Sequence, residues 1–339
     1  MTSSVTIGLR IDNAVPHGNE SDTGTVIALW RTVDQFFDGK PFTAQDGVGG
    51  RPTDYRISLD ASGLLQTFET ASAQSGSFSA HQKAFAGNAG LAIDGALEIT
   101  VQSVNGNLDE EEAYHVATVF LQQLVLAANL KNPGSIQLLG TRFTGQRAHR
   151  FEAQQFDSRI LYGALKTARY DEWPPIDTSL DFAAIWSWLE QCETSHTGTA
   201  IRDANKVLFT LLKVAEQRHE YSARTVLLVL YQLEVLLHCR HASSSGPMHR
   251  HMRMILGDIP DAADCFNELY EVRHQLFHGN QPVQRPPMIS HNTEAAIREM
   301  IGQHNTAVES GTAMVLALLQ DLIRHGAQFY AFTETMARR

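Results

Sequence analysis

Short stretches in the first half of the chain alternate apolar and polar residues. The clearest are 5–11, 55–59 and 97–101. Because successive side chains of a strand point to opposite faces of the sheet, this pattern predicts three half-buried β-strands. Residues 136–143 and 151–161 are further candidates for strands.

A long helical pattern starts at the acidic run 109–112 and continues to about Leu130. Carboxylates in the first turn of a helix interact favourably with the helix dipole. We therefore interpret the run as a helix start, in preference to the alternative of an acidic metal site. The Asn-Pro-Gly segment 132–134 ends the pattern, because proline and glycine do not continue a helix.

The second half of the chain changes to helical spacing of its apolar residues after Pro174 and Pro175. Two adjacent prolines exclude regular structure and favour an extended linker, which we place at 173–179. The expected helices lie near 180–192, 201–218, 222–239, 249–256, 258–278 and 293–324. The sequence thus predicts an α+β protein, with an N-terminal domain of strands and helices (1–172), of unknown role, followed by an all-α bundle (180–339).

Composition and charge narrow the possible functions. The chain has 339 residues, of which 43% are hydrophobic and 19% charged, as in ordinary globular proteins. Its formal net charge is −10, whereas proteins that bind nucleic acids through their overall charge are usually basic. Binding of RNA would therefore require a local basic cluster.

The cysteines and the apolar runs indicate in which cell compartment we expect the protein. Cys192, Cys239 and Cys265 form no C-x-x-C pair, and their odd number argues against a disulfide framework. The N-terminus lacks the basic segment and apolar run of a signal peptide. The longest apolar stretch, 225–237, is too short and too polar to span a bilayer. We expect a cytoplasmic protein with no membrane partner.

The segment 269–280 crowds polar groups at the expected end of a helix. Arg273, His274 and His278 fall within six residues, and Gly279 follows as a suitable C-terminal cap. Each such group costs free energy if it is buried without a partner. The crowding is therefore more typical of a phosphate-binding or RNA-cleaving site than of a core helix.

The order Arg273, four residues, His278 and Gly279 resembles the signature of the HEPN superfamily. With the Leu-Tyr pair that precedes it, the pattern resembles more narrowly the ApeA-like branch. The segment 230–237, apolar with one embedded Glu234, is similar to the apolar helix of that branch. The resemblance covers the last half of the chain.

This resemblance implies an all-α HEPN-like helical bundle that forms a homodimer through the helical domain. It also implies a composite active site that cleaves RNA without a metal ion or other cofactor. A role in prokaryotic defence or toxin systems follows from the same resemblance.

The residue types suit cleavage by attack of the ribose 2′-hydroxyl. Arg273 can hold the phosphate and stabilise the transition state, because its fork donates two hydrogen bonds and keeps its charge. His278 is the expected acid or base, since imidazole titrates near neutrality. His274 can orient the phosphate or assist the second proton transfer, and Asn280 is a supporting candidate. Glu234 needs a partner within its apolar run, and Arg273 is the obvious one.

Helical geometry limits what one copy of this segment can do. His274 and His278 share a face because they are four residues apart. Arg273 is five residues from His278, which turns it away by roughly 140° on an ideal helix. Two copies related by a two-fold axis would bring both sets of side chains into one cleft.

The segment 238–253 is rich in histidine and arginine. Its members are His238, Cys239, Arg240, His241, His249, Arg250, His251 and Arg253. The three arginines, Arg240, Arg250 and Arg253, form the best local basic patch of the chain, and we expect them to attract RNA. The histidines could instead hold zinc in a zinc-dependent hydrolase, although no regular spacing joins their two pairs.

Two interpretations without catalysis stay open. The helical domain could be a non-catalytic HEPN-like module that dimerises or holds RNA or a nucleotide, while the N-terminal domain senses a ligand. Judged on the residues alone, Arg273 could simply pair with Glu234 and His278 could simply cap a helix, because short motifs often match by chance.

Overall fold

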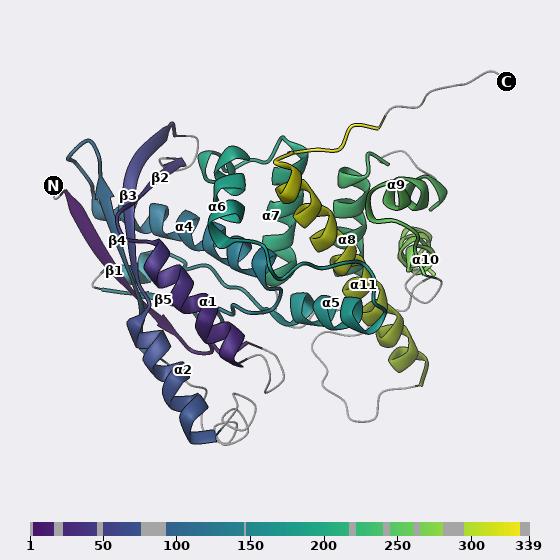
Figure 1. The fold of residues 1–339 in the computed structure, drawn as a ribbon, viewed down its shortest axis with the longest axis horizontal. Coiled ribbons are helices and arrows are strands. Elements are labelled where there is room, and N and C mark those ends of the chain that lie inside the picture. Colours follow the sequence, from purple (N-terminus) through teal and green to yellow (C-terminus); the bar gives the residue numbers. More distant parts are fainter. Residues whose placement is uncertain are drawn as a thin grey trace. The chain divides into compact units, whose positions relative to one another are not determined.

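The computed structural model describes residues 3–16, 23–45, 50–75, 93–145, 147–216, 222–239, 245–260, 265–280 and 295–332. Within these ranges the chain forms an antiparallel sheet of five strands and ten α-helices (Figure 1). This confirms the predicted α+β class with a helical C-terminal region.

The chain forms two compact units that interleave along the sequence. The sheet unit comprises residues 1–162, 178–201 and 215–218, and the helical unit comprises residues 163–177, 202–214 and 219–339. The sequence had suggested a single break, at 173–179. The structure instead places residues 163–177 in the helical unit and residues 178–201 in the sheet unit.

The sheet has the strand order β2-β3-β4-β1-β5. Its strands are β1 (Ser4–Ile11), β2 (Lys40–Gln45), β3 (Pro52–Asp60), β4 (Ile93–Ser103) and β5 (Arg142–Thr144). The three strands predicted from alternation are β1, β3 and β4. In the ladder of β1 and β4, Ile7 lies opposite Ile99 and Leu9 opposite Leu97. All four side chains are buried, as the alternating pattern requires.

Four helices belong to the sheet unit. They are α1 (Thr23–Phe36), α2 (Ser62–Ser75), α4 (Glu110–Lys131) and α6 (Phe182–Gln191). α4 packs against β1, β2 and β4, and it starts where the acidic run predicted. The carboxylate of Asp109 accepts a hydrogen bond of 2.7 Å from the N–H of Glu112 and so caps the helix.

Aromatic packing explains why α6 belongs to the sheet unit. The Trp186 ring of α6 lies 4.6 Å from the ring of Phe37 and 5.9 Å from that of Phe120 on α4. Phe182 adds an edge-to-face contact with Phe36, at 5.3 Å. Buried aromatic pairs of this kind contribute strongly to a core, so α6 packs here although it follows the two prolines.

The two additional strands predicted in the first half are largely wrong. Only residues 142 and 143 of the first lie in a strand, β5, and α5 (Arg159–Tyr170) begins inside the second. Ile160, Leu161 and Ala164 of α5 are buried on one face of the helix. A short apolar run fits a strand and a buried helix equally well, which is why the pattern misled.

The helical unit contains most of α5 and five further helices of the described residues. They are α7 (Asp203–Glu216), α8 (Ala223–Leu236), α9 (Gly246–Leu256), α10 (Phe266–Phe277) and α11 (Ala295–His325). α8 packs against both α10 and α11, and α10 packs against α11. The almost wholly apolar α8 is therefore the central helix, as predicted.

The start of α10 differs from the prediction. Asp258 does not cap a helix, since residues 257–260 are not helical and α10 begins at Phe266. Pro260 disfavours helical backbone in the residue before it, and that residue, Ile259, is buried. Residues 257–260 thus bury an apolar side chain without themselves forming a helix.

Among the described residues, two helical stretches are long and apolar enough to cross a membrane. They are Glu110–Lys131 and Ile301–His325, and 78% and 83% of their most apolar windows are buried inside the structure. Core helices of soluble proteins meet the same criterion, so this is weak evidence of a span.

Candidate functional site

The C-terminal end of α10 is held by a Schellman turn. Gly279 has a φ of +70°. Its N–H donates to the carbonyl of Leu276 (3.2 Å), and the N–H of Asn280 donates to the carbonyl of Gln275 (2.9 Å). The predicted cap at Gly279 is thus confirmed, and it leaves His278 as the last residue before the chain turns away.

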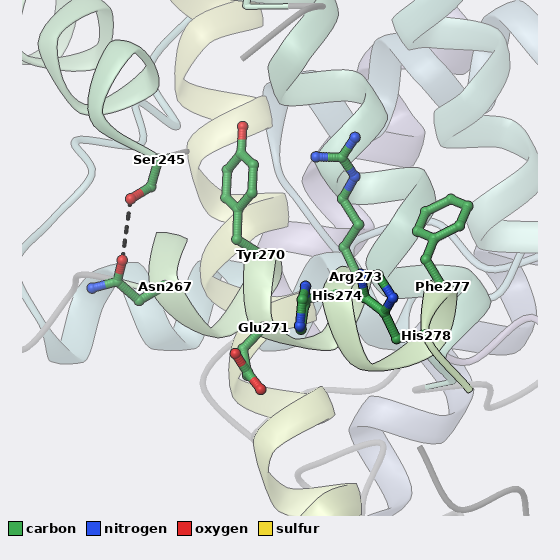
Figure 2. A pocket seen from close by; sticks show the side chains of 8 residues that line it. All are labelled: Ser245, Asn267, Tyr270, Glu271, Arg273, His274, Phe277 and His278. Carbon is green, nitrogen blue, oxygen red and sulfur yellow. Dashed lines mark hydrogen bonds between the residues drawn. The ribbon is translucent and has the colours of Figure 1, made fainter. Parts of the chain in front are cut away.

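This helix end lines an open pocket, called the α10 pocket below (Figure 2). It has a volume of about 610 Å³ and is lined by Ser245, Asn267, Tyr270, Glu271, Arg273, His274, Phe277 and His278. Ser245 precedes α9, and its hydroxyl donates a hydrogen bond of 3.1 Å to Asn267. The other seven residues come from α10 and its cap, so one helix supplies almost the whole lining.

The lining residues form two stripes along α10. Tyr270, Arg273 and Phe277 follow one stripe, and the guanidinium carbon of Arg273 lies 5.7 Å and 6.0 Å from the centres of the two rings. His274 and His278 follow the neighbouring stripe, with ring centres 4.3 Å apart. Figure 2 shows the guanidinium pointing away from both imidazoles. Within one chain, the cation and the titratable rings therefore do not converge.

Glu234 of α8 lies behind the guanidinium. Its Oε1 is 3.9 Å from Nη1 of Arg273, and the side chains are 16% and 37% exposed. The hydroxyl of Tyr270 donates to the same oxygen at 3.5 Å. The partner predicted for Arg273 is thus in place, at an ion-pair distance that is beyond hydrogen-bond range.

Burial controls the electrostatics of this group. It raises the pKa of Glu234, although the Arg273 charge and the Tyr270 hydroxyl act in the opposite direction. Burial, together with the Glu234 charge, raises the pKa of Tyr270 to about 12, so the phenol keeps its proton at neutral pH. Tyr270 therefore serves as a hydrogen-bond donor and not as a base.

The described histidines of segment 238–253 have separate partners. Nε2 of His238 lies 3.5 Å from Oδ2 of Asp203. Nδ1 of His251 lies 2.7 Å from the carbonyl oxygen of Leu237, to which it donates, and its ring stacks on Phe332 with centres 3.8 Å apart. In the part of the chain that the structure describes, no group of three or more His, Cys, Asp or Glu side chains could hold a metal ion. His241 lies outside the described residues.

Cys239 does not supply a reactive thiol. Burial and the nearby charge of Glu234 raise its pKa to about 11, so the sulfur stays protonated at neutral pH. Its Sγ donates to the carbonyl of Leu237 at 3.2 Å. The residue is part of the local packing.

Of the predicted RNA-binding arginines, the two that the structure describes do not line the α10 pocket. Arg250 and Arg253 are exposed on α9, and Nε of Arg253 lies 3.7 Å from Oδ1 of the exposed Asp258. Arg240 lies outside the described residues. Asn280 is exposed, but only its backbone takes part in the turn described above. Of the predicted site, Arg273, His274 and His278 share the pocket, with Glu234 behind it.

Sequence reasoning missed Phe277, Asn267 and Ser245 as lining residues. The spacing of Phe277, four residues after Arg273 on the same helix, was the available signal. Nothing in the sequence pointed to Ser245, because its place depends on how α9 packs beside α10.

Comparison of the chain with known proteins adds no relative. No family model, no curated protein and no solved structure matches it. The HEPN resemblance therefore stays a prediction that rests on the motif residues of α8 and α10.

Proposed function

We propose that this protein is a metal-independent endoribonuclease of HEPN type that acts as a homodimer. The observation that carries the proposal is the α10 pocket, where Arg273, His274 and His278 lie together on an open surface. A site built almost entirely from one helix end encloses little of a ligand, and a second copy of the helix would complete it.

The proposed reaction is an in-line displacement at phosphorus. A neutral imidazole takes the proton of the 2′-hydroxyl, and O2′ attacks the adjacent phosphate. The bond between phosphorus and O5′ breaks, and an imidazolium gives its proton to the departing O5′. The products are a 2′,3′-cyclic phosphate and a free 5′-hydroxyl, so no other reactant is required.

The side chains take distinct parts in this proposal. Arg273 binds the non-bridging phosphate oxygens and stabilises the charge that develops in the transition state. His278 transfers protons, and His274, whose ring lies beside it, orients the phosphate or carries the second proton. Glu234 is a positioning residue, because it contacts the guanidinium from behind and not the substrate.

Cleavage of single-stranded RNA by purified protein tests the proposal. Arg273→Ala and His278→Ala should each lower the cleavage rate by at least about 100-fold, as expected for loss of charge stabilisation or acid–base catalysis. The matched controls are Arg31→Ala, which removes an exposed arginine paired with Glu69 in the sheet unit, and His325→Ala, which removes an exposed histidine. Wild-type rates in both pocket variants would overturn the proposal.

A non-catalytic module that binds RNA or a nucleotide is the second candidate. It is favoured by the guanidinium of Arg273, which faces Glu234 and turns away from the imidazoles of its own chain. Wild-type protein that binds RNA but leaves it intact between about pH 6 and pH 8, where imidazole titrates, would support this candidate over the enzyme.

A further inference from the structure

We propose that Phe277 is the stacking platform for an unpaired base beside the phosphate that Arg273 binds. This inference rests on the proposed function and adds to it a residue that selects the substrate. It predicts that the pocket distinguishes unpaired from paired nucleotides and is tolerant of base identity.

The first observation is the exposure of Phe277. The residue is 72% exposed at the last position of α10. Single exposed apolar side chains are common on protein surfaces, so exposure alone carries no argument. Among the large exposed apolar side chains of the described residues, however, Phe277 is the one that lines the α10 pocket.

The second observation is the position of Arg273 between two aromatic rings, of which only the first is held by a hydrogen bond. Tyr270 is half-buried, and its hydroxyl is bound to Glu234. Phe277 has no polar atom to bind, and Figure 2 shows it on the same side of α10 as the guanidinium. Tyr270 and Glu234 thus hold the cation, and Phe277 leaves an aromatic surface open to a ligand.

The pairing of a cation with a free aromatic ring matches the chemistry of a nucleotide. The guanidinium binds the phosphate oxygens with a fork of N–H donors, and the phenyl ring offers its face to the adjacent base. Every base has a π-face, so stacking accepts all four bases. A base inside a duplex is already stacked between its neighbours and must leave the helix before it can reach Phe277.

The imidazoles lie on the neighbouring stripe of the same helix end. We expect a nucleotide held by Phe277 and Arg273 to present its ribose to His274 and His278 of a second copy, because the guanidinium points away from the imidazoles of its own chain. Phe277 would thereby fix which phosphodiester is presented for cleavage.

The binding experiment uses the full-length His278→Ala protein, which is expected to leave RNA intact. The probe is a single-stranded RNA oligonucleotide with 2-aminopurine at successive positions, compared with the same strand annealed to its complement. We expect quenching of 2-aminopurine at one or two positions. Adding Phe277→Ala should remove the quenching and weaken the affinity by roughly 5- to 150-fold, the range for loss of one stacked base.

Three comparisons make the assignment specific. Phe277→Trp should keep the affinity, because a larger ring still stacks. Phe329→Ala, which removes another exposed phenylalanine outside the pocket, should change nothing. An abasic site at the quenched position should weaken binding to the protein with Phe277 but add nothing to Phe277→Ala, since both changes remove the same contact.

The outcomes separate this inference from the proposed function. Unchanged affinity in Phe277→Ala, while Arg273→Ala loses binding, overturns the stacking role and leaves the nuclease proposal standing. A change in oligomeric state in Phe277→Ala, measured by sedimentation, overturns it as well, because the ring would then belong to an interface between copies. Wild-type protein that neither binds nor cleaves the RNA overturns both.

Discussion

The ends of α8 and α10 are built alike but differ in what their histidines contact. Each helix ends in a turn whose central residue has a left-handed backbone, His238 (φ +53°) after α8 and Gly279 (φ +70°) after α10. After α8, the N–H of Cys239 donates to the carbonyl of Glu234 at 2.9 Å, the same bonding pattern as at the end of α10. The backbone therefore ends both helices with the same type of turn.

The histidine side chains at the two helix ends differ in their surroundings. At the α8 end, His238 meets Asp203, and His251 donates to a backbone carbonyl while its ring is covered by Phe332. At the α10 end, His274 and His278 are exposed in a pocket. Neighbouring segments supply partners for the histidines at the end of α8, whereas the histidines at the end of α10 face the pocket. The comparison teaches that histidine content alone does not mark a site, because what packs around the histidines decides their use.

The largest expected effect tests whether the open end is half of a site. Arg273→Ala and His278→Ala, each inactive alone, should regain about a quarter of the wild-type activity when mixed at equal amounts, since half of the dimers are mixed and each mixed dimer has one intact composite site. The measurement is RNA cleavage after the subunits have been allowed to exchange. Activity that stays at the level of either variant alone would show that each site draws its Arg and His from one chain.

A second prediction concerns Glu234, which connects the two ends. Glu234→Gln should lower the cleavage rate by roughly tenfold, because the neutral amide no longer holds the guanidinium of Arg273 in place through the ion pair. Substrate affinity should fall less than the rate if the contact matters mainly in the transition state. Gln275→Ala, which removes a hydrogen bond to Glu271 on the same helix, is a control for general disturbance of α10.

The same substitution has a pH signature. Burial raises the pKa of Glu234, so the ionised form costs free energy in the folded state. The contribution of this group to stability is present below its unfolded pKa and is lost as the pH rises through its folded pKa. Glu234→Gln should thus be more stable than wild type at pH 7 and equal to it near pH 4. Urea unfolding at several pH values measures this, and a variant that is less stable at pH 7 would contradict it.

A third prediction concerns the turn that ends α10. A Cβ at Gly279 would meet no atom within 4 Å, so Gly279→Ala adds only backbone strain at φ +70°. We expect a loss of about 1–2 kcal/mol in the free energy of unfolding. Gly257→Ala is a suitable comparison, because that position also has a positive φ and open space, but it follows α9. Unchanged stability in Gly279→Ala would mean that the turn can relax.

The smallest expected effect comes from the opposite exchange at α8. His238→Gly removes the strain of a non-glycine residue at φ +53° and also removes the contact with Asp203, which for a partly exposed pair is worth about 0–1 kcal/mol. We expect a net gain of up to about 1 kcal/mol. Thermal unfolding with His238→Asn as a second variant measures it. A clear loss of stability would show that the Asp203 contact matters more than the strain.

Much of the architecture was predictable from local pattern. Alternation identified β1, β3 and β4, because one face of each strand must be buried. The acidic turn before α4 and the glycine after α10 marked helix ends through capping. The strand expected at 151–161 failed because a short apolar run does not distinguish a strand from a buried helix.

For the candidate site, the sequence by itself determined the chemical content of the α10 end. It also determined, through helical periodicity, that Arg273 and His278 point in different directions. The pairing of Glu234 with Arg273 was expected from the sequence, but only the tertiary structure decided where that carboxylate lies, that Phe277 joins the same pocket, and that His238 and His251 have partners. The reason is physical: periodicity acts over a few residues of one helix, whereas burial, ion pairing and exposure depend on which distant segments pack together.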